Sequence, residues 1–152
     1  MTTAARTGFV ELDRNGLEVL SREQCLGLLA SATLGRVGIT LGALPVILPV
    51  HFCLVGERIL FRTRPGTKLA AATCDAVVAF EVDAIDPVSH GGWSVVVTGC
   101  ARAVHEPARF SALAAADLPG WRSSGEDQLV EVTTDLITGR RIVPLGGRLL
   151  RR

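Results

Sequence analysis

The segment spanning residues 58–69 concentrates side chains and backbone groups that could bind an anion. It reads Arg-Ile-Leu-Phe-Arg-Thr-Arg-Pro-Gly-Thr-Lys-Leu, an apolar strand followed by a Pro-Gly turn and a helix start. Lys68 is the single lysine beside fifteen arginines, and an ammonium and a guanidinium are not freely exchanged at a phosphate site. Backbone N–H groups, the Thr67 hydroxyl and Lys68 together predict an anion site. A hairpin exit with a solvated lysine is the alternative.

The composition predicts one globular domain over residues 1–152, with residues 1–20 as a loose arm. The chain is 48% hydrophobic and 20% charged, with a net charge of +1. Scattered arginines and this small net charge argue against an extended nucleic-acid surface. The apolar excess fits a deep ligand site or a subunit interface. The sequence contains no apolar run of membrane-spanning length and no signal-like N-terminus, so no membrane partner is expected.

The cysteines predict neither a metal site nor disulfides. Cys25, Cys53, Cys74 and Cys100 are widely spaced, without a Cys-x-x-Cys pair or a nearby histidine pair. A zinc site is therefore not expected. Each thiol lies in an apolar run, where cysteine behaves as a small hydrophobe. This pattern indicates a reducing, cytoplasmic environment.

Hairpin signals dominate the rest of the chain. Ser21 and Gln24 form a capping box that starts a helix ending near Ala32. Tight turns then separate alternating or valine-rich runs, which predicts an antiparallel sheet. We expect strands at residues 9–12, 35–41, 44–55, 58–63, 76–83, 93–104, 128–133 and 135–143, and short helices at 67–73 and 108–116. Such a set is mainly β with small helices and favours a barrel without free edges.

Two prolines interrupt the second long strand. Pro45 and Pro49 cannot donate to a sheet ladder. Either this strand bends, or one of its edges faces something other than a neighbouring strand, such as a ligand.

Four motifs in order resemble the pyridoxamine-phosphate-oxidase-like, flavin-binding split β-barrels. They are Leu-Gly-Arg-Val-Gly-Ile after the capped helix, Leu-Pro-Val-His-Phe at 48–52, Phe-Arg-Thr-Arg-Pro-Gly-Thr-Lys-Leu at 61–69, and the pair Val-Ala-Phe-Glu-Val at 78–82 with Gly-Trp-Ser-Val-Val-Val-Thr-Gly at 92–99. The resemblance covers roughly residues 21–104. It implies an antiparallel split barrel that forms a homodimer, with flavin mononucleotide (FMN) in a groove at the subunit interface.

The resemblance also implies which residues hold the cofactor. Arg62, Thr63, Thr67 and Lys68 would surround the phosphate, and Val50 with its neighbours would offer backbone groups to the ring. Trp93 and Ser94 would approach from the second subunit or line the groove. The full cofactor-binding set is Pro49, Val50, His51, Phe61, Arg62, Thr63, Thr67, Lys68, Leu69, Trp93 and Ser94.

The implied function is a flavin-dependent oxidoreductase that passes hydride or electrons to or from a small organic substrate. A flavin supplies the redox chemistry itself, and no Ser-His-Asp or Cys-His arrangement indicates hydrolysis. The second strand lacks the basic residues of the vitamin oxidase, and the C-terminus lacks its substrate-gripping segment. Pyridoxine phosphate is therefore not the expected substrate. A reductase using the deazaflavin F420 and a non-catalytic module that holds flavin or haem are the alternatives.

Several single residues have two interpretations. His51 is either a core histidine or a cofactor contact, and Trp93 is either core or cofactor-facing. Glu81 lies in an apolar strand and needs a partner such as Arg62 or Arg36.

Three further residues lie near the end of the chain. Trp121 is either a cap on a partner's groove or a loop anchor. The pair Arg140 and Arg141 is either solvated or bound to a second phosphate.

Overall fold

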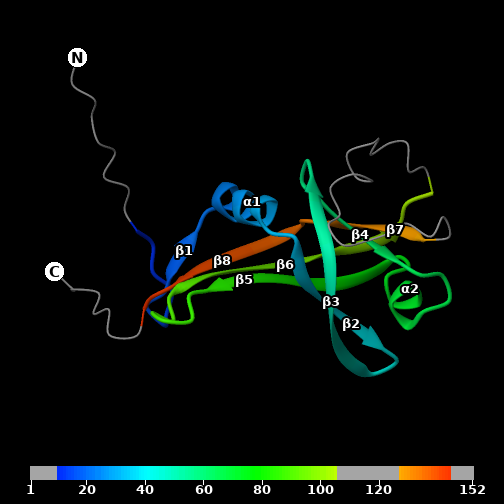
Figure 1. Cartoon of the computed structure of the whole chain (residues 1–152), viewed down its shortest axis with the longest axis horizontal. Helices are drawn as coiled ribbons and strands as arrows, with labels where there is room; N and C mark the ends of the chain where they lie inside the picture. Colours follow the sequence, from blue (N-terminus) through cyan, green and yellow to red (C-terminus); the bar gives the residue numbers. More distant parts are fainter. Residues whose placement is uncertain (1–9, 106–126, 145–152) are drawn as a thin grey trace, which may run out of the picture.

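The computed structural model describes residues 10–105 and 127–144. Within these residues one antiparallel sheet is accompanied by two short helices (Figure 1). The elements are β1 (Glu18–Leu20), α1 (Arg22–Ser31), β2 (Leu34–Leu41), β3 (Leu44–Val55), β4 (Arg58–Thr63), α2 (Lys68–Ala72), β5 (Ala76–Ile85), β6 (Gly92–Ala103), β7 (Gln128–Thr133) and β8 (Leu136–Ile142). The fold is mainly β, as expected.

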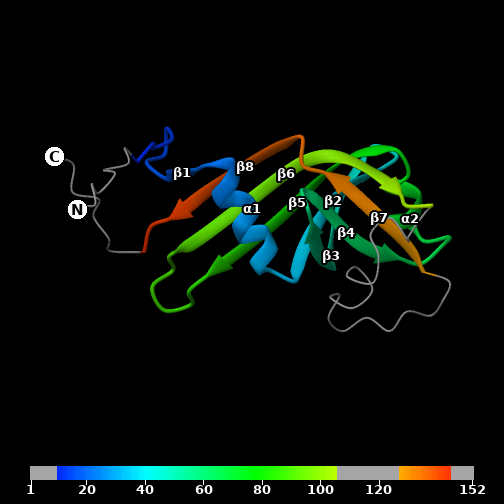
Figure 2. The ribbon, with the colours of Figure 1, turned by 90° about the horizontal axis from the view of Figure 1, so that it is seen from above.

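Six of these strands close into a barrel. The order β6-β5-β2-β3-β4-β7 returns to β6, because β7 pairs with β6 as well as with β4. The first half of β6 pairs instead with β8, which in turn pairs with β1. Figure 2 shows β6 and β8 running side by side away from the barrel. The antiparallel split barrel expected from the motifs is therefore confirmed.

The exchange of partners along β6 depends on a glycine. Residues Gly92 to Thr98 pair with β8, and Ala101 to Ala103 pair with β7. Between them, a Cβ on Gly99 would collide with the Thr133 carbonyl, so no larger residue fits there without a shift of the backbone. The Thr133 hydroxyl accepts a hydrogen bond from the Cys100 N–H at 2.9 Å, which joins the two strands at the branch.

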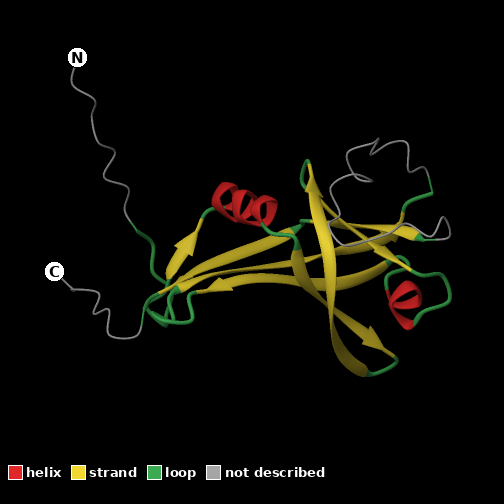
Figure 3. Cartoon of the chain, viewed as in Figure 1, coloured by secondary structure: helices red, strands yellow, loops and turns green. Residues whose placement is uncertain are grey.

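Aromatic and valine side chains fill the barrel. Phe52, Phe61 and Phe80 are fully buried, and the rings of Phe52 and Phe80 pack edge to face with centroids 4.8 Å apart. Helix α1 buries Cys25 and Leu29 in the core, and Leu69 and Ala72 of α2 pack against the same core. Figure 3 shows the two helices well apart along the sheet. Burial raises the pKa of the Cys25 thiol, which fits a packing role.

Local signals set the element boundaries. The Ser21 side chain accepts from the Gln24 N–H and the Gln24 side chain accepts from the Ser21 N–H, so the capping box is confirmed. Gly42 and Gly56 have φ of +61° and +60° in the two hairpin turns that flank β3, a region that favours glycine. From residue 34 onward, the expected strand limits agree with the observed ones to within about two residues. The helix expected at 108–116 lies outside the described residues.

The N-terminal arm and the thiols differ from expectation. Residues Glu18–Leu20 form a strand paired with β8, so the loose arm expected at 1–20 does not extend to residue 20. Instead of a strand at 9–12, the structure has only an isolated bridge between Leu12 and Glu18, and Phe9 lies outside the described residues. Cys74 is exposed rather than packed, because it follows α2 in a connecting loop.

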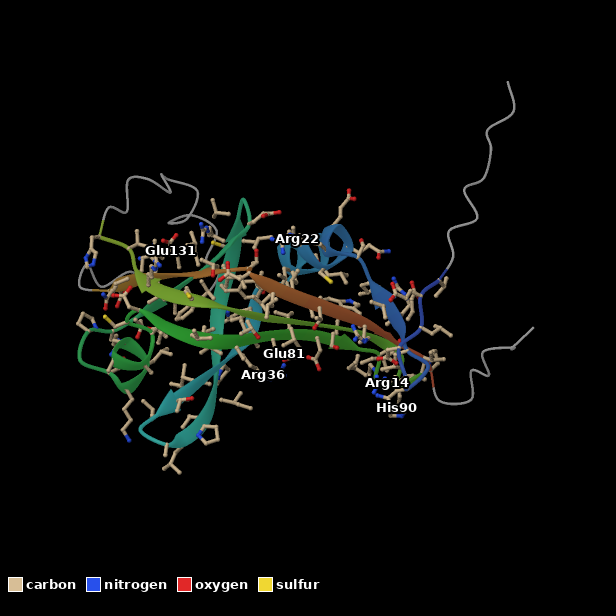
Figure 4. The ribbon with its side chains drawn as sticks, turned by 180° about the vertical axis from the view of Figure 1, so that it is seen from behind. Arg14, Arg22, Arg36, Glu81, His90 and Glu131 are labelled. Atoms are coloured by element: carbon tan, nitrogen blue, oxygen red, sulfur yellow. The ribbon has the colours of Figure 1, made fainter. Side chains whose placement is uncertain are left out.

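The sheet face opposite α1 is open to solvent. A line of neighbouring residues crosses it, here called the outer row: Ile47, Gly38, Ala79, Thr98 and Leu136. Ile47 is 70% exposed and Leu136 is 68% exposed. Beside the row, Arg36 contacts Glu81 at 3.0 Å and Asp83 at 3.1 Å (Figure 4). Among the described residues, no helix combines the length and apolar character that crossing a bilayer requires.

Candidate functional site

A pocket opens where β3 and β4 separate. The pairing of these strands ends at Phe52 and Phe61, while β3 runs on to Leu44 paired with β2 only, and the chain after β4 turns into α2. The resulting space has a volume of about 280 Å³. It is lined by Pro49, Val50, His51, Arg62, Thr63, Arg64, Thr67 and Leu69. The pocket therefore brings together two of the motifs that sequence reasoning singled out.

The free edge of β3 explains its two prolines. The Phe52 N–H donates to the Thr33 carbonyl at 3.0 Å, on the β2 side. Backbone N–H and C=O groups of successive residues point to opposite edges of a strand. The even-numbered residues of β3 therefore direct these groups toward β2, and the odd-numbered residues direct them to the opposite edge. Pro45 and Pro49 are odd-numbered, so neither removes a donor from the β2 ladder. Near the pocket, this edge offers the His51 N–H and the Pro49 carbonyl.

Val50 does not have the backbone role expected of it. Its N–H points toward β2, where Val50 pairs with Gly35, and its side chain is buried. The amide on the pocket side belongs to His51, one residue later. The sequence identified the correct strand, but the direction of each N–H depends on which neighbour β3 pairs with.

Arg62 carries an unsatisfied polar atom in this pocket. Its Nε is buried without a hydrogen-bond partner, and within the described residues its side chain forms no ion pair. Leaving such a donor unpaired costs about 1–3 kcal/mol. The lining residues include no carboxylate. An anion in the pocket would supply the opposite charge that the Arg62 guanidinium lacks.

The two threonines form a local network. The Thr63 and Thr67 hydroxyls are 3.1 Å apart. Thr67 also donates to the Arg64 carbonyl at 2.8 Å and accepts from the Ala70 N–H at 3.1 Å, as the N-cap of α2. Thr67 thus holds the turn between β4 and α2 in place.

The remaining expected cofactor residues are placed differently. Lys68 is exposed and does not line the pocket, whereas its neighbour Leu69 does. The Phe61 side chain is fully buried in the core, so only its backbone could meet a ligand. Trp93 and Ser94 lie on β6, opposite Ala84 and Asp83 of β5. Neither lines the pocket of its own chain, so their predicted cofactor role requires a second subunit.

Sequence reasoning missed Arg64 as a lining residue. The signal was present, because Arg64 follows Arg62 by two residues in the Arg-Thr-Arg motif. Alternate residues of an extended segment can share a side. Whether both reach one pocket depends on where the strand ends, which the motif alone does not show.

The structure also shows the position of His51 and the partner of Glu81. His51 is exposed at the pocket and not in the core. Arg36, and not Arg62, is the partner of Glu81. The carboxylates of Asp83 and Glu81 raise the pKa of Arg36 above its usual value, and Asp83 has the larger effect.

The structure shows the partners of the arginine pair near the end of the chain. Arg140 and Arg141 bind carboxylates of the N-terminal segment, Asp13 at 2.7 Å and Glu18 at 3.0 Å. Both guanidiniums are therefore paired with carboxylates rather than with a second phosphate, and the Arg141 side chain is still 50% exposed to solvent. Trp121 lies outside the described residues.

The described part of the chain contains no cluster of three or more side chains suited to hold a metal ion. What the pocket offers is an unpaired guanidinium, a free backbone edge and apolar walls. These features suit an elongated ligand with an anionic end and a flat, hydrogen-bonding end.

Comparison with known proteins agrees with this fold. The family model of pyridoxamine 5'-phosphate oxidase matches residues 21–141. A Mycobacterium tuberculosis protein, Rv0080, is 42% identical over 132 residues, covering 82% of this chain and 84% of that protein.

Solved structures share the architecture. The FAD binding protein from Mycobacterium smegmatis superposes with a TM-score of 0.71 at 37% identity, over 82% of this chain and 97% of that one. A FAD and heme binding protein from the same organism has a TM-score of 0.67 at 20% identity, over 82% and 74% of the two chains. This second likeness concerns the fold alone.

Proposed function

Because the chain belongs to the pyridoxamine 5'-phosphate oxidase family, we propose that it is a flavin-binding oxidoreductase whose cofactor occupies the pocket between β3 and β4. The observation that carries the proposal is the Arg62 guanidinium, which lines a pocket without carboxylates and forms no ion pair within the described residues. The FAD binding of the 37% identical M. smegmatis protein supports it. The sequence motifs favour FMN, and FAD contains the same ring, ribityl chain and first phosphate.

Each lining residue has a distinct task in this proposal. Arg62 binds the phosphate as a charge-assisted donor. The His51 N–H and the Pro49 carbonyl meet the polar edge of the ring, and Val50 and Leu69 supply apolar contact. When bound, the flavin supplies hydride and electron transfer, while the protein contributes position and electrostatics. The substrate is a small organic molecule that reaches the open side of the ring.

We further propose that the chain acts as a homodimer through the outer face of the sheet. Ile47 of the outer row is two residues from Pro49, which lines the pocket, and both side chains are on the outer face of β3. A second subunit seated on this face would therefore close the pocket. It would also bring the partner's β6 within reach, as the predicted roles of Trp93 and Ser94 require. The cytoplasmic location indicated by the cysteines remains part of this proposal.

A titration tests the cofactor. Apoprotein is titrated with riboflavin, FMN, FAD and F420 while the fluorescence of each compound is followed. We expect FMN and FAD to bind in the micromolar range or better, and riboflavin, which lacks the phosphate, to bind at least tenfold more weakly. If F420 binds more tightly than the flavins, the cofactor is the deazaflavin and not a flavin. If none of the four compounds binds, the proposal is wrong.

A second measurement tests the oxidoreductase activity. The flavin-loaded protein is reduced by light and mixed with quinone, nitro and aldehyde acceptors under nitrogen. We expect at least one class to reoxidise the bound flavin faster than it reoxidises free reduced flavin. If no class does so, the protein is a flavin-holding module and not an enzyme.

A further inference from the structure

Arg64 is a second guanidinium at the same pocket. It is the first residue after β4 and lines the pocket together with Arg62. Its carbonyl accepts hydrogen bonds from the Thr67 N–H at 3.3 Å and from the Thr67 hydroxyl at 2.8 Å. These two bonds fix the backbone from which the Arg64 side chain extends. Within the described residues, that side chain forms neither an ion pair nor a hydrogen bond.

The hydroxyl protons of Thr63 and Thr67 are already used in hydrogen bonds within the protein, so neither hydroxyl can donate to an anion. A hydroxyl has one proton and two acceptor pairs. Thr67 gives its proton to the Arg64 carbonyl and accepts from the Ala70 N–H. The proton between Thr63 and Thr67 must then come from Thr63. Binding of phosphate oxygens in this pocket therefore falls to the guanidinium groups.

Two guanidiniums at one pocket can bind a phosphate ligand in two ways. One guanidinium can hold one phosphate through two parallel hydrogen bonds. Arg62 and Arg64 are two residues apart, which separates their backbones by about 6–7 Å in an extended segment. The two groups can share one doubly charged phosphate monoester, or each can hold one of two linked phosphates. No carboxylate lines the pocket to neutralise the second cation.

We propose that Arg64 binds the second phosphate of a flavin dinucleotide, so that this pocket selects FAD over FMN. The proposal rests on the proposed flavin site and adds to it a residue that determines cofactor specificity. Arg62 holds the phosphate next to the ribityl chain, and Arg64 holds the phosphate that carries the adenosine.

The test compares the FAD and FMN dissociation constants of the wild type, Arg64→Gln and Arg58→Gln. Arg58 is a matched control, because it is an exposed arginine at the other end of β4 and does not line this pocket. We expect the wild type and the control to bind FAD about tenfold more tightly than FMN. Arg64→Gln should weaken FAD binding to within about threefold of FMN and leave FMN binding unchanged. Thermal unfolding confirms that all three proteins fold alike.

Three results would overturn the proposal. If Arg64→Gln weakens FMN and FAD equally, Arg64 contacts the phosphate that both share. If the ratio of the two dissociation constants does not change, Arg64 plays no part in selection. In both cases the flavin site itself stands. If the wild type binds neither nucleotide, the proposed function fails and this assignment fails with it.

Discussion

At the scale of single residues, Arg62 lines the pocket and carries a hydrogen-bond donor that has no acceptor. Its buried Nε has no partner, so this donor destabilises the folded chain. Few polar groups in a folded protein are left in this condition. Removing the guanidinium should therefore lower flavin affinity without lowering the free energy of unfolding of the apoprotein.

We predict that Arg62→Met lowers FMN affinity by about tenfold to a hundredfold, equivalent to about 1.5–3 kcal/mol, because a charge-assisted contact is lost. The free energy of unfolding of the apoprotein should not fall, since an unsatisfied donor is removed. Fluorescence titration and urea unfolding measure the two quantities. Arg58→Met on the same strand is the control, and a clear loss of apoprotein stability in Arg62→Met alone would contradict the prediction.

Lys68 was one of four residues that sequence reasoning placed around the phosphate, with Arg62, Thr63 and Thr67. A buried contact there would be worth about 1.5–3 kcal/mol, but the side chain is exposed and does not line the pocket. Exposed charge pairs contribute about 0.2–1 kcal/mol. We therefore predict that Lys68→Ala weakens FMN binding by no more than about fivefold and leaves riboflavin binding unchanged. A larger loss for FMN in the same titration would restore Lys68 as a direct phosphate ligand.

At the scale of elements, strand β3 has one paired edge and one edge open at the pocket. A proline substitution can therefore probe either edge. Val50 directs its N–H toward β2, and His51 directs its N–H toward the pocket. This geometry reverses the roles that would be assigned to the two residues from the motif alone.

We predict that Val50→Pro unfolds or strongly destabilises the chain, because it removes a donor from the β2 ladder. His51→Pro should fold and lose flavin affinity, because only the open-edge donor is removed. His51→Ala should retain both properties, since the amide remains. Circular dichroism and titration distinguish the three variants. A folded His51→Pro protein that binds flavin like the wild type would show that the ring does not contact this edge.

The short strand β1 is held by an acid–base contact. Asp13 accepts from the Arg140 guanidinium at 2.7 Å and from the N–H groups of Leu17 and Asn15 at 3.0 and 2.9 Å. The Arg140 hydrogen bond, followed by that from Leu17, lowers the pKa of Asp13 below its usual 3.8. A carboxyl whose pKa is lower in the folded state stabilises that state above its unfolded pKa. This contribution is lost as the pH falls through the folded pKa.

We predict that Asp13→Asn lowers the free energy of unfolding at neutral pH, and that its difference from the wild type shrinks as the pH falls below about 4. Urea unfolding from pH 3 to pH 7 measures this difference. Glu57→Gln, which disrupts the exposed contact with Arg22, is the control for a general charge effect. A difference that grows toward low pH would contradict the sign of the prediction.

At the scale of the whole molecule, the outer face of the sheet exposes apolar side chains over the part of the chain that the structure describes. Several large exposed side chains lie on it, including Leu34, Ile47, Val77, Val96 and Leu136. Contiguous apolar surface of this kind marks an interaction site more often than a free surface. The face also adjoins the pocket through Pro49, so assembly and cofactor binding should be linked.

We predict a homodimer of twice the 16.1 kDa chain mass, burying well over about 1,200 Å² in total. Ala79→Arg, at the centre of the outer row, should give monomers and weaken flavin binding. Val88→Arg, on a loop residue that is 88% exposed, should do neither. Sedimentation at micromolar concentration measures the mass. A monomeric wild type would remove the dimer and the predicted roles of Trp93 and Ser94.

Much of the fold follows from local sequence signals. The glycines at 42 and 56 occupy turn conformations that other residues rarely adopt, and they set two hairpins. Ser21 and Gln24 start α1 because their side chains satisfy the free N–H groups of its first turn. The strand and helix of the Arg-Thr-Arg-Pro-Gly-Thr motif follow from the same kind of short-range chemistry. Such features act over a few residues, so the sequence alone was sufficient to predict them.

Tertiary structure decided how these elements meet. The separation of β3 from β4 creates the pocket, and it determines that Arg64 reaches it while Lys68 does not. Pairing with β2, rather than the residue type, directs the Val50 N–H away from the pocket. Arg36 and Glu81 are neighbours only through the register of β2 with β5. Each of these facts depends on contacts between residues far apart in the chain, which composition, turn signals and strand periodicity do not specify.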